Sequence, residues 1–180
     1  MSAMKFNSFE KCKPKDLVRF SDRTGTHWAL VGDRGNARLM LLVLSTGKDG
    51  PYCINIMGPM DMVKPPYENA VVLSYGTEYS AHIDHAGDCE VGREGKLIGA
   101  RGSLVFTETD RLICCRYDDA APKKGYYSLG TGKIQSEPGG ARAVFADWEL
   151  VWFKSKEEKP IKLLQAHAKR TPIIVAPVSI

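Results

Sequence analysis

Short runs of apolar or alternating residues, separated by clusters of Gly, Pro, Asn and Asp, dominate the chain from residue 15 to residue 153. This pattern is typical of β-strands that are joined by turns about every 8–12 residues. The 3.6-residue repeat of an amphipathic helix is missing from this span. The pattern predicts an all-β fold with twelve strands, at residues 17–20, 27–31, 37–44, 52–57, 71–75, 79–83, 89–91, 103–107, 112–117, 126–129, 133–136 and 148–153.

The twelve predicted strands divide into three groups of four, which indicates an internal repeat. In each group the second strand opens with an aromatic residue, and a turn with Gly35, Gly87 or Gly132 leads to the third strand. Glycine supplies the positive φ that such hairpin turns need. A twofold repeat is the alternative, because 38–39 aligns with 111–112 and 70–71 with 143–144. We favour the threefold repeat because it accounts for every predicted strand.

The third group carries the sequence GYYSL at residues 125–129 and the closing sequence FADWELV at 145–151. With three such groups, residues 15–153 resemble a β-trefoil, in particular the fascin-like or mushroom-lectin type, whose units carry G-x-Y-L-x-A and W-E-x-F-x-L strands. The first group has no W-E signature, and the second has only SLVF at 103–106. No Q-x-W triplet occurs, which argues against a ricin-type sugar site. The resemblance implies a three-unit β-trefoil that binds ligands.

The character of the sequence changes after residue 153. The segment 154–180 carries the whole excess of positive charge in a chain whose net charge is +4. Pro160 suits the first position of a helix, so residues 156–170 predict one short basic helix. The last ten residues, TPIIVAPVSI, are apolar and predict an extended tail. We therefore expect a trefoil domain over 15–153, followed by a basic helix and an apolar tail over 154–180.

Composition excludes several functional classes. Residues 1–153 are electrically neutral, which argues against a surface that grips nucleic-acid phosphates. The longest apolar run, 39–44, is far shorter than the ~20 residues of a membrane-spanning helix, and no apolar stretch of a secretory signal occurs at the start. Five cysteines without a C-x-x-C spacing predict neither a zinc ribbon nor a redox motif. We expect a cytoplasmic protein without cofactor or resident metal.

One cluster could nevertheless ligate a metal. If 79–83 is a strand, His82 and Asp84 share one face and His85 falls in the following turn, so three ligands could converge on zinc or nickel. The simpler interpretation, which we favour, is a polar hairpin in which Asp84 and Asp88 accept hydrogen bonds within the turn. A small metal-dependent enzyme that uses His82, Asp84 and His85 is therefore the least favoured function.

The trefoil resemblance implies shallow ligand pockets at the turns between the second and third strands of each group. These turns carry carboxylates and an amide that suit neighbouring sugar hydroxyls, while an aromatic ring such as that of Trp28, Tyr79 or Tyr127 can cover C–H groups. We predict a non-catalytic, lectin-like module with the ligand-binding residues Trp28, Asp33, Arg34, Asn36, Asp84, His85 and Asp88. The alternative is a cytoskeletal or inhibitor-type trefoil that binds a protein partner through loops or the basic C-terminal segment.

Overall fold

The computed structural model describes residues 5–33, 35, 39–44, 51–55, 70–83, 89–91, 99–117, 123–155, 158–168 and 173–174. These residues form sixteen β-strands and one short 3₁₀-helix, and the part of the chain so described contains no α-helix. Accordingly, no helix within these ranges has the length and apolar character needed to cross a membrane. The prediction of an all-β fold is confirmed, and each of the twelve predicted strands has an observed counterpart.

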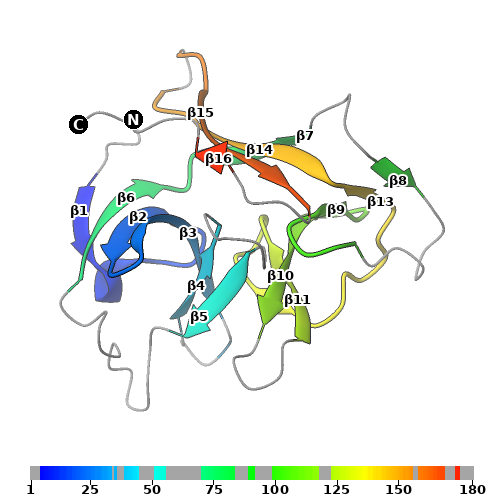
Figure 1. The fold of residues 1–180 in the computed structure, drawn as a ribbon, viewed down its shortest axis with the longest axis horizontal. Helices are drawn as coiled ribbons and strands as arrows, with labels where there is room; N and C mark the ends of the chain where they lie inside the picture. The colour runs from blue at the N-terminus through cyan, green and yellow to red at the C-terminus, as the bar shows by residue number, and fades with distance from the viewer. Residues whose placement is uncertain are drawn as a thin grey trace.

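The larger sheet holds twelve strands in the order β1-β6-β2-β3-β4-β5-β10-β9-β13-β8, with β11 and β12 continuing from β10 (Figure 1). All neighbours pair antiparallel except β5 and β10, which meet in parallel where Tyr52 lies opposite Arg116. The strands of this sheet are β1 (Lys5–Ser8), β2 (Leu17–Asp22), β3 (Gly25–Asp33), β4 (Leu39–Val43), β5 (Tyr52–Asn55), β6 (Val71–Gly76), β8 (Cys89–Val91), β9 (Leu104–Phe106), β10 (Arg111–Tyr117), β11 (Lys123–Ser128), β12 (Ile134–Gln135) and β13 (Ala143–Phe145).

The smaller sheet is antiparallel and has the order β16-β15-β14-β7. Its strands are β7 (Tyr79–Ile83), β14 (Asp147–Trp152), β15 (Ile161–His167) and β16 (Ile173–Ile174). In Figure 1 this sheet lies across the top of the larger one. The chain therefore leaves the larger sheet after β6, contributes β7 to the smaller sheet, and returns to the larger sheet with β8.

The predicted C-terminal helix is wrong, because β15 occupies its centre. Leu164, Ala166 and Ala168 are buried while Gln165 between them is exposed, which is the two-residue period of a strand. β15 pairs with β14 from His167 opposite Asp147 to Ile161 opposite Trp152, with a register shift at Leu163. This pairing with a neighbouring strand overrides the helical spacing of the apolar residues, since local propensity is only a weak constraint. The prediction of an extended tail agrees with β16, which pairs with β15.

The largest hydrophobic core lies between the two sheets and contains Trp28, Tyr75, Tyr127, Trp148 and Trp152. A second apolar cluster covers the opposite face of the β2–β5 meander, where Phe9 of the 3₁₀-helix Phe9–Lys11 packs with Cys12. Both faces of this meander are therefore buried. For this reason β4, unlike a strand with one solvent face, is apolar at every position.

Strand pairing differs between the first and second predicted groups. In the first group β2, β3, β4 and β5 pair in sequence. In the second group β6 pairs with β1 and β2, β7 with β14, β8 with β13, and β9 with β10 and β13. The all-β character is thus settled, whereas the threefold trefoil arrangement stays a prediction. β1 and β15 also extend these sheets with residues from outside 15–153.

Candidate functional site

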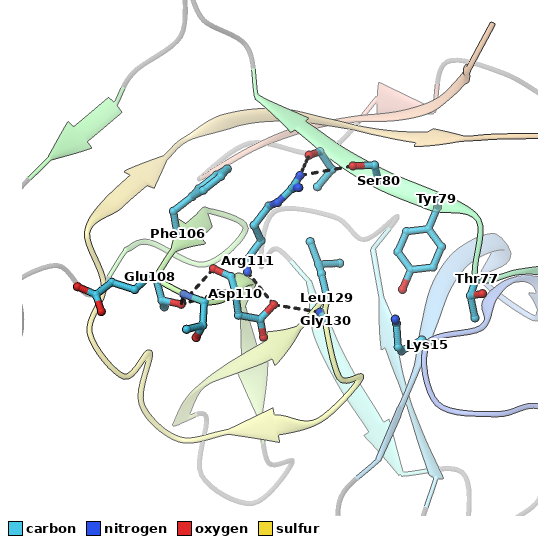
Figure 2. Close-up of a pocket in the computed structure, with 13 residues that line it drawn as sticks. Lys15, Thr77, Tyr79, Ser80, Phe106, Glu108, Asp110, Arg111, Leu129 and Gly130 are labelled. Atoms are coloured by element: carbon cyan, nitrogen blue, oxygen red, sulfur yellow. Dashed lines mark hydrogen bonds between the residues drawn. The ribbon is translucent and has the colours of Figure 1, made fainter. Parts of the chain in front are cut away.

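A pocket of about 470 Å³ opens at the junction of the two sheets (Figure 2). Its walls come from four segments that are distant in the sequence: Lys15, the start of β7 at 77–81, the β9–β10 turn at 106–111, and the β11–β12 turn at 129–130. The volume lies within the roughly 300–1,000 Å³ that is usual for small-molecule sites. The pocket is therefore large enough for a ligand of the size of a simple sugar.

The β9–β10 turn is shaped by the side chain of Thr107. Its Oγ1 accepts hydrogen bonds from the backbone N–H of Asp110 at 2.9 Å and of Thr109 at 3.3 Å. The backbone N–H of Thr107 in turn donates to the carbonyl of Asp110 at 2.9 Å. A hydroxyl that bonds backbone groups two and three residues later is a common way to fix a tight turn. The Thr107-x-x-Asp110 spacing thus holds this wall of the pocket in one conformation.

Asp110 joins the two turns that border the pocket. Its Oδ1 accepts hydrogen bonds from the backbone N–H of Arg111 at 2.7 Å and of Gly130 at 3.0 Å, and its Oδ2 accepts the hydroxyl proton of Ser128. A Cβ at position 130 would lie 2.8 Å from Asp110 Oδ1, so glycine there lets the β11–β12 turn approach this carboxylate closely. The Asp110 carboxylate is therefore occupied by the protein itself.

Arg111 spans the pocket from β10 to β7 (Figure 2). Its Nη1 donates to the carbonyl of Ala81 at 3.1 Å and approaches Ser80 Oγ at 3.5 Å. The guanidinium also lies over the Phe106 ring, 5.8 Å from its centroid, where the electron-rich face attracts a cation. One edge of the guanidinium is thus held in place, and within the described residues no carboxylate forms an ion pair with it.

Lys15 has an unusual backbone conformation, with a φ of 75°. It is the third residue of a turn in which the backbone N–H of Asp16 donates to Lys13 O at 3.0 Å. Pro14 occupies the second position, as in a type II turn, whose third position normally carries glycine because of its positive φ. Strained residues of this kind gather at functional sites. The backbone N–H of Lys15 donates to Val31 O at 2.8 Å, which holds the turn against β3.

Tyr79 contributes its ring to the pocket wall. Its hydroxyl is buried and makes no hydrogen bond of acceptable geometry within the described ranges. The hydroxyl of Tyr127 lies close to it, but Tyr127 donates its own proton to Val31 O at 2.9 Å. Burial raises the pKa of both phenols, so both stay neutral at physiological pH.

Of the predicted ligand-binding residues the structure describes Trp28 and Asp33, and neither lines the pocket. Trp28 is 1% exposed, and its ring centroid lies 4.9 Å from that of Tyr75. The Arg19 guanidinium lies over the Trp28 ring, 5.7 Å from its centroid. It is a core residue with no face open to a sugar, which corrects the prediction for Trp28. Asp33 is half-buried and its Oδ1 accepts the Gly35 N–H at 2.7 Å, as a turn carboxylate does. The other predicted residues lie outside the described residues: Arg34, Asn36, Asp84, His85 and Asp88.

Of the three possible metal ligands the structure describes only His82. It is half-buried on β7 opposite Glu149, with its ring 6.2 Å from that of Phe153. Where the structure describes side chains, no group of three or more His, Cys, Asp or Glu residues is arranged to hold a metal. Because Asp84 and His85 fall outside those ranges, the metal hypothesis stays a prediction.

Sequence reasoning missed the polar residues that form the pocket, above all Arg111, Asp110 and Thr107. A local signal for the turn existed in the Thr-x-x-Asp spacing. No local signal existed for Arg111, because its contacts with Ala81 and Ser80 join segments about 30 residues apart.

Comparisons with known protein families, with curated proteins and with solved structures find no match to this chain.

Proposed function

We propose that the protein is a non-catalytic carbohydrate-binding module and that the pocket of about 470 Å³ between the two sheets is its binding site. The observation that carries this proposal is the mixture of groups in the wall. Partly buried rings of Phe106 and Tyr79 lie beside hydroxyl-bearing and charged side chains. A sugar ring presents both hydroxyls and apolar C–H faces, so it needs this combination. The polar residues of the wall are Lys15, Thr77, Ser80, Thr107, Glu108, Thr109, Asp110 and Arg111.

The wall favours binding over hydrolysis. Cleavage of a glycosidic bond normally requires two carboxyl groups that act on opposite sides of the bond. The pocket wall has two carboxylates, and both are engaged: Glu108 pairs with Arg142 at 2.5 Å, and Asp110 accepts three hydrogen bonds. Asp110 is held within the wall by these donors, and the exposed Glu108 is paired at the surface, so we infer that a bound sugar leaves unchanged.

The resemblance to trefoil lectins implies the same class of ligand, and the threefold arrangement remains part of this proposal. The alternative, a protein-interaction module, relied partly on the basic C-terminal segment. Within that segment Lys162 pairs with Glu149 at 2.5 Å across β14 and β15. The other five basic residues of 154–180 take no part in this contact, so a protein partner bound by the segment stays the alternative.

A glycan-array screen of the full chain, followed by calorimetry on each hit, tests the proposal. Thr109→Trp places a large side chain at an exposed position of the pocket wall and is expected to abolish binding. Gln135→Trp is the matched control, because Gln135 is exposed on β12 and does not line the pocket. We expect the control to bind as the unaltered protein does.

Three outcomes would count against the proposal in different ways. A blank array overturns the carbohydrate function. Binding that survives Thr109→Trp places the sugar elsewhere. Binding that is lost in Asp33→Ala or Asp84→Ala, but not in Thr109→Trp, moves the site to the turns that the sequence predicted.

A further inference from the structure

The pocket wall contains two cationic side chains without acidic partners. Arg111 and Lys15 both line the pocket. No carboxylate within the described residues forms an ion pair with either of them. A charged group that lines a cavity without a partner is an electrostatic requirement that a ligand can meet.

The acidic side chains of the wall offset these cations only in part. Glu108 forms an exposed ion pair with Arg142 at 2.5 Å, and the three donors to the Asp110 carboxylate are uncharged, so they do not cancel its charge. Arg111 and Lys15 therefore outnumber Asp110, the one carboxylate of the wall that is in no ion pair within the described residues, and the wall keeps a net positive charge. A neutral sugar would leave this charge unpaired, whereas an acidic sugar would pair with it.

Arg111 is also prepared for an anion before the ligand arrives. Contacts of Nη1 with Ala81 O and Ser80 Oγ, together with the Phe106 ring, fix one edge of the guanidinium. The planar guanidinium can then use its remaining N–H groups for a carboxylate with little further loss of side-chain freedom. Charge-assisted bonds of this type are the strongest hydrogen bonds that proteins form with ligands.

The backbone of Lys15 supports the same inference independently. Glycine would fit its φ of 75° without strain, yet the chain has lysine at this position, on the pocket wall. A residue that costs stability where glycine would relieve the strain indicates a function for its side chain.

We propose that the pocket selects an acidic carbohydrate, a uronic acid or a glycan that ends in one, whose carboxylate pairs with Arg111 while Lys15 adds positive charge to the same wall. This inference rests on the proposed carbohydrate function and specifies its ligand class. Removal of one charge-assisted contact should weaken acid binding by roughly 10-fold to 100-fold. Binding of the acid should also weaken as salt is added, because ions screen exposed charge pairs.

Calorimetry on the full chain, with matched pairs of neutral and acidic sugars, tests the inference. Glucose is compared with glucuronate and galactose with galacturonate, and acetate and sulfate serve as anions without a sugar ring. We expect at least tenfold tighter binding of one acid than of its neutral partner. Arg111→Gln should abolish this preference, whereas Arg23→Gln, which removes an equal charge from an exposed position outside the pocket wall, should preserve it.

Lys15→Gly keeps the test decisive if Arg111→Gln fails to fold. It should keep or raise the unfolding temperature, since glycine accepts the positive φ, while it weakens binding of the acid. Equal binding of acidic and neutral sugars overturns this inference and leaves the carbohydrate function intact. Binding of acetate or sulfate, without binding of any sugar, overturns the carbohydrate function and leaves an anion site. No binding of any probe overturns both.

Discussion

Trp148 joins the smaller sheet to the larger one, so its replacement measures how much that junction contributes to stability. The indole is 1% exposed in the main core, and its Nε1 donates to the carbonyl of Gly102 at 2.7 Å. No other donor to Gly102 O occurs within the part of the chain that the structure describes. Trp148→Phe keeps an aromatic ring in the core but leaves this buried carbonyl without a partner.

Two effects add in this variant. An unsatisfied buried acceptor costs about 1–3 kcal/mol, and the smaller ring removes packing worth about 1–2 kcal/mol. We therefore expect a loss of about 2–5 kcal/mol in the free energy of unfolding, measured by urea denaturation with circular dichroism. For a chain of this size the unfolding temperature should fall by roughly 5–20 °C. Phe6→Leu is the control, since Phe6 is 69% exposed. A loss below about 1 kcal/mol in Trp148→Phe would refute this account of the junction.

Three other predictions concern the cysteines, strand β15 and Gly32. Of the five cysteines only Cys89 is exposed, and burial raises the pKa of Cys12 to about 12 and of Cys114 to about 11. In the native protein one thiol per chain should therefore react rapidly with Ellman's reagent at pH 8. Rapid reaction of the Cys89→Ser variant would contradict this. Gln165→Thr should be more stable than Gln165→Ala by up to about 1 kcal/mol, because position 165 is an exposed strand site and threonine favours strands. The reverse order of the two unfolding temperatures would favour a helix at this position instead. Gly32→Ala should lose about 1–3 kcal/mol in denaturant unfolding, because its Cβ would lie 3.2 Å from the Tyr127 ring and 3.4 Å from Gly132 O; an unchanged midpoint would show that these neighbours move at no cost.

Strands that are long enough to show an alternating or continuous apolar pattern between turn signals were predictable from the sequence, and some of the shortest strands were not. The strands β2, β3 and β10 follow apolar runs between clear turn signals, so their positions could be predicted closely. β1 has the sequence KFNS and β13 the sequence AVF, which are too short to show a period. β15 was mistaken for a helix because Ile161, Leu164 and Ala168 have helical spacing, whereas pairing with β14 determines its conformation.

The pocket was harder to predict than the fold. Each of its walls is an ordinary turn or strand end when it is taken alone, and only the topology brings Lys15, Tyr79 and Arg111 together. The hydrogen bonds that hold the Asp110 carboxylate likewise come partly from Ser128 and Gly130, which belong to another hairpin. Sequence reasoning could identify turns with polar side chains, but not which of these turns would face one another.

The position of β7 has a consequence for the order in which the newly made chain can fold. β7 is synthesised between β6 and β8, yet its partner β14 follows only after the whole 84–146 segment. The β2–β5 meander can form as soon as it leaves the ribosome, since its neighbours are consecutive. The apolar face of β7, by contrast, must wait for β14 while most of the larger sheet assembles around it. Such late pairing between distant segments slows folding and exposes an unpaired edge. Chaperones that shield β-edges should therefore bind nascent chains that end between residues 84 and 146 more strongly than longer ones.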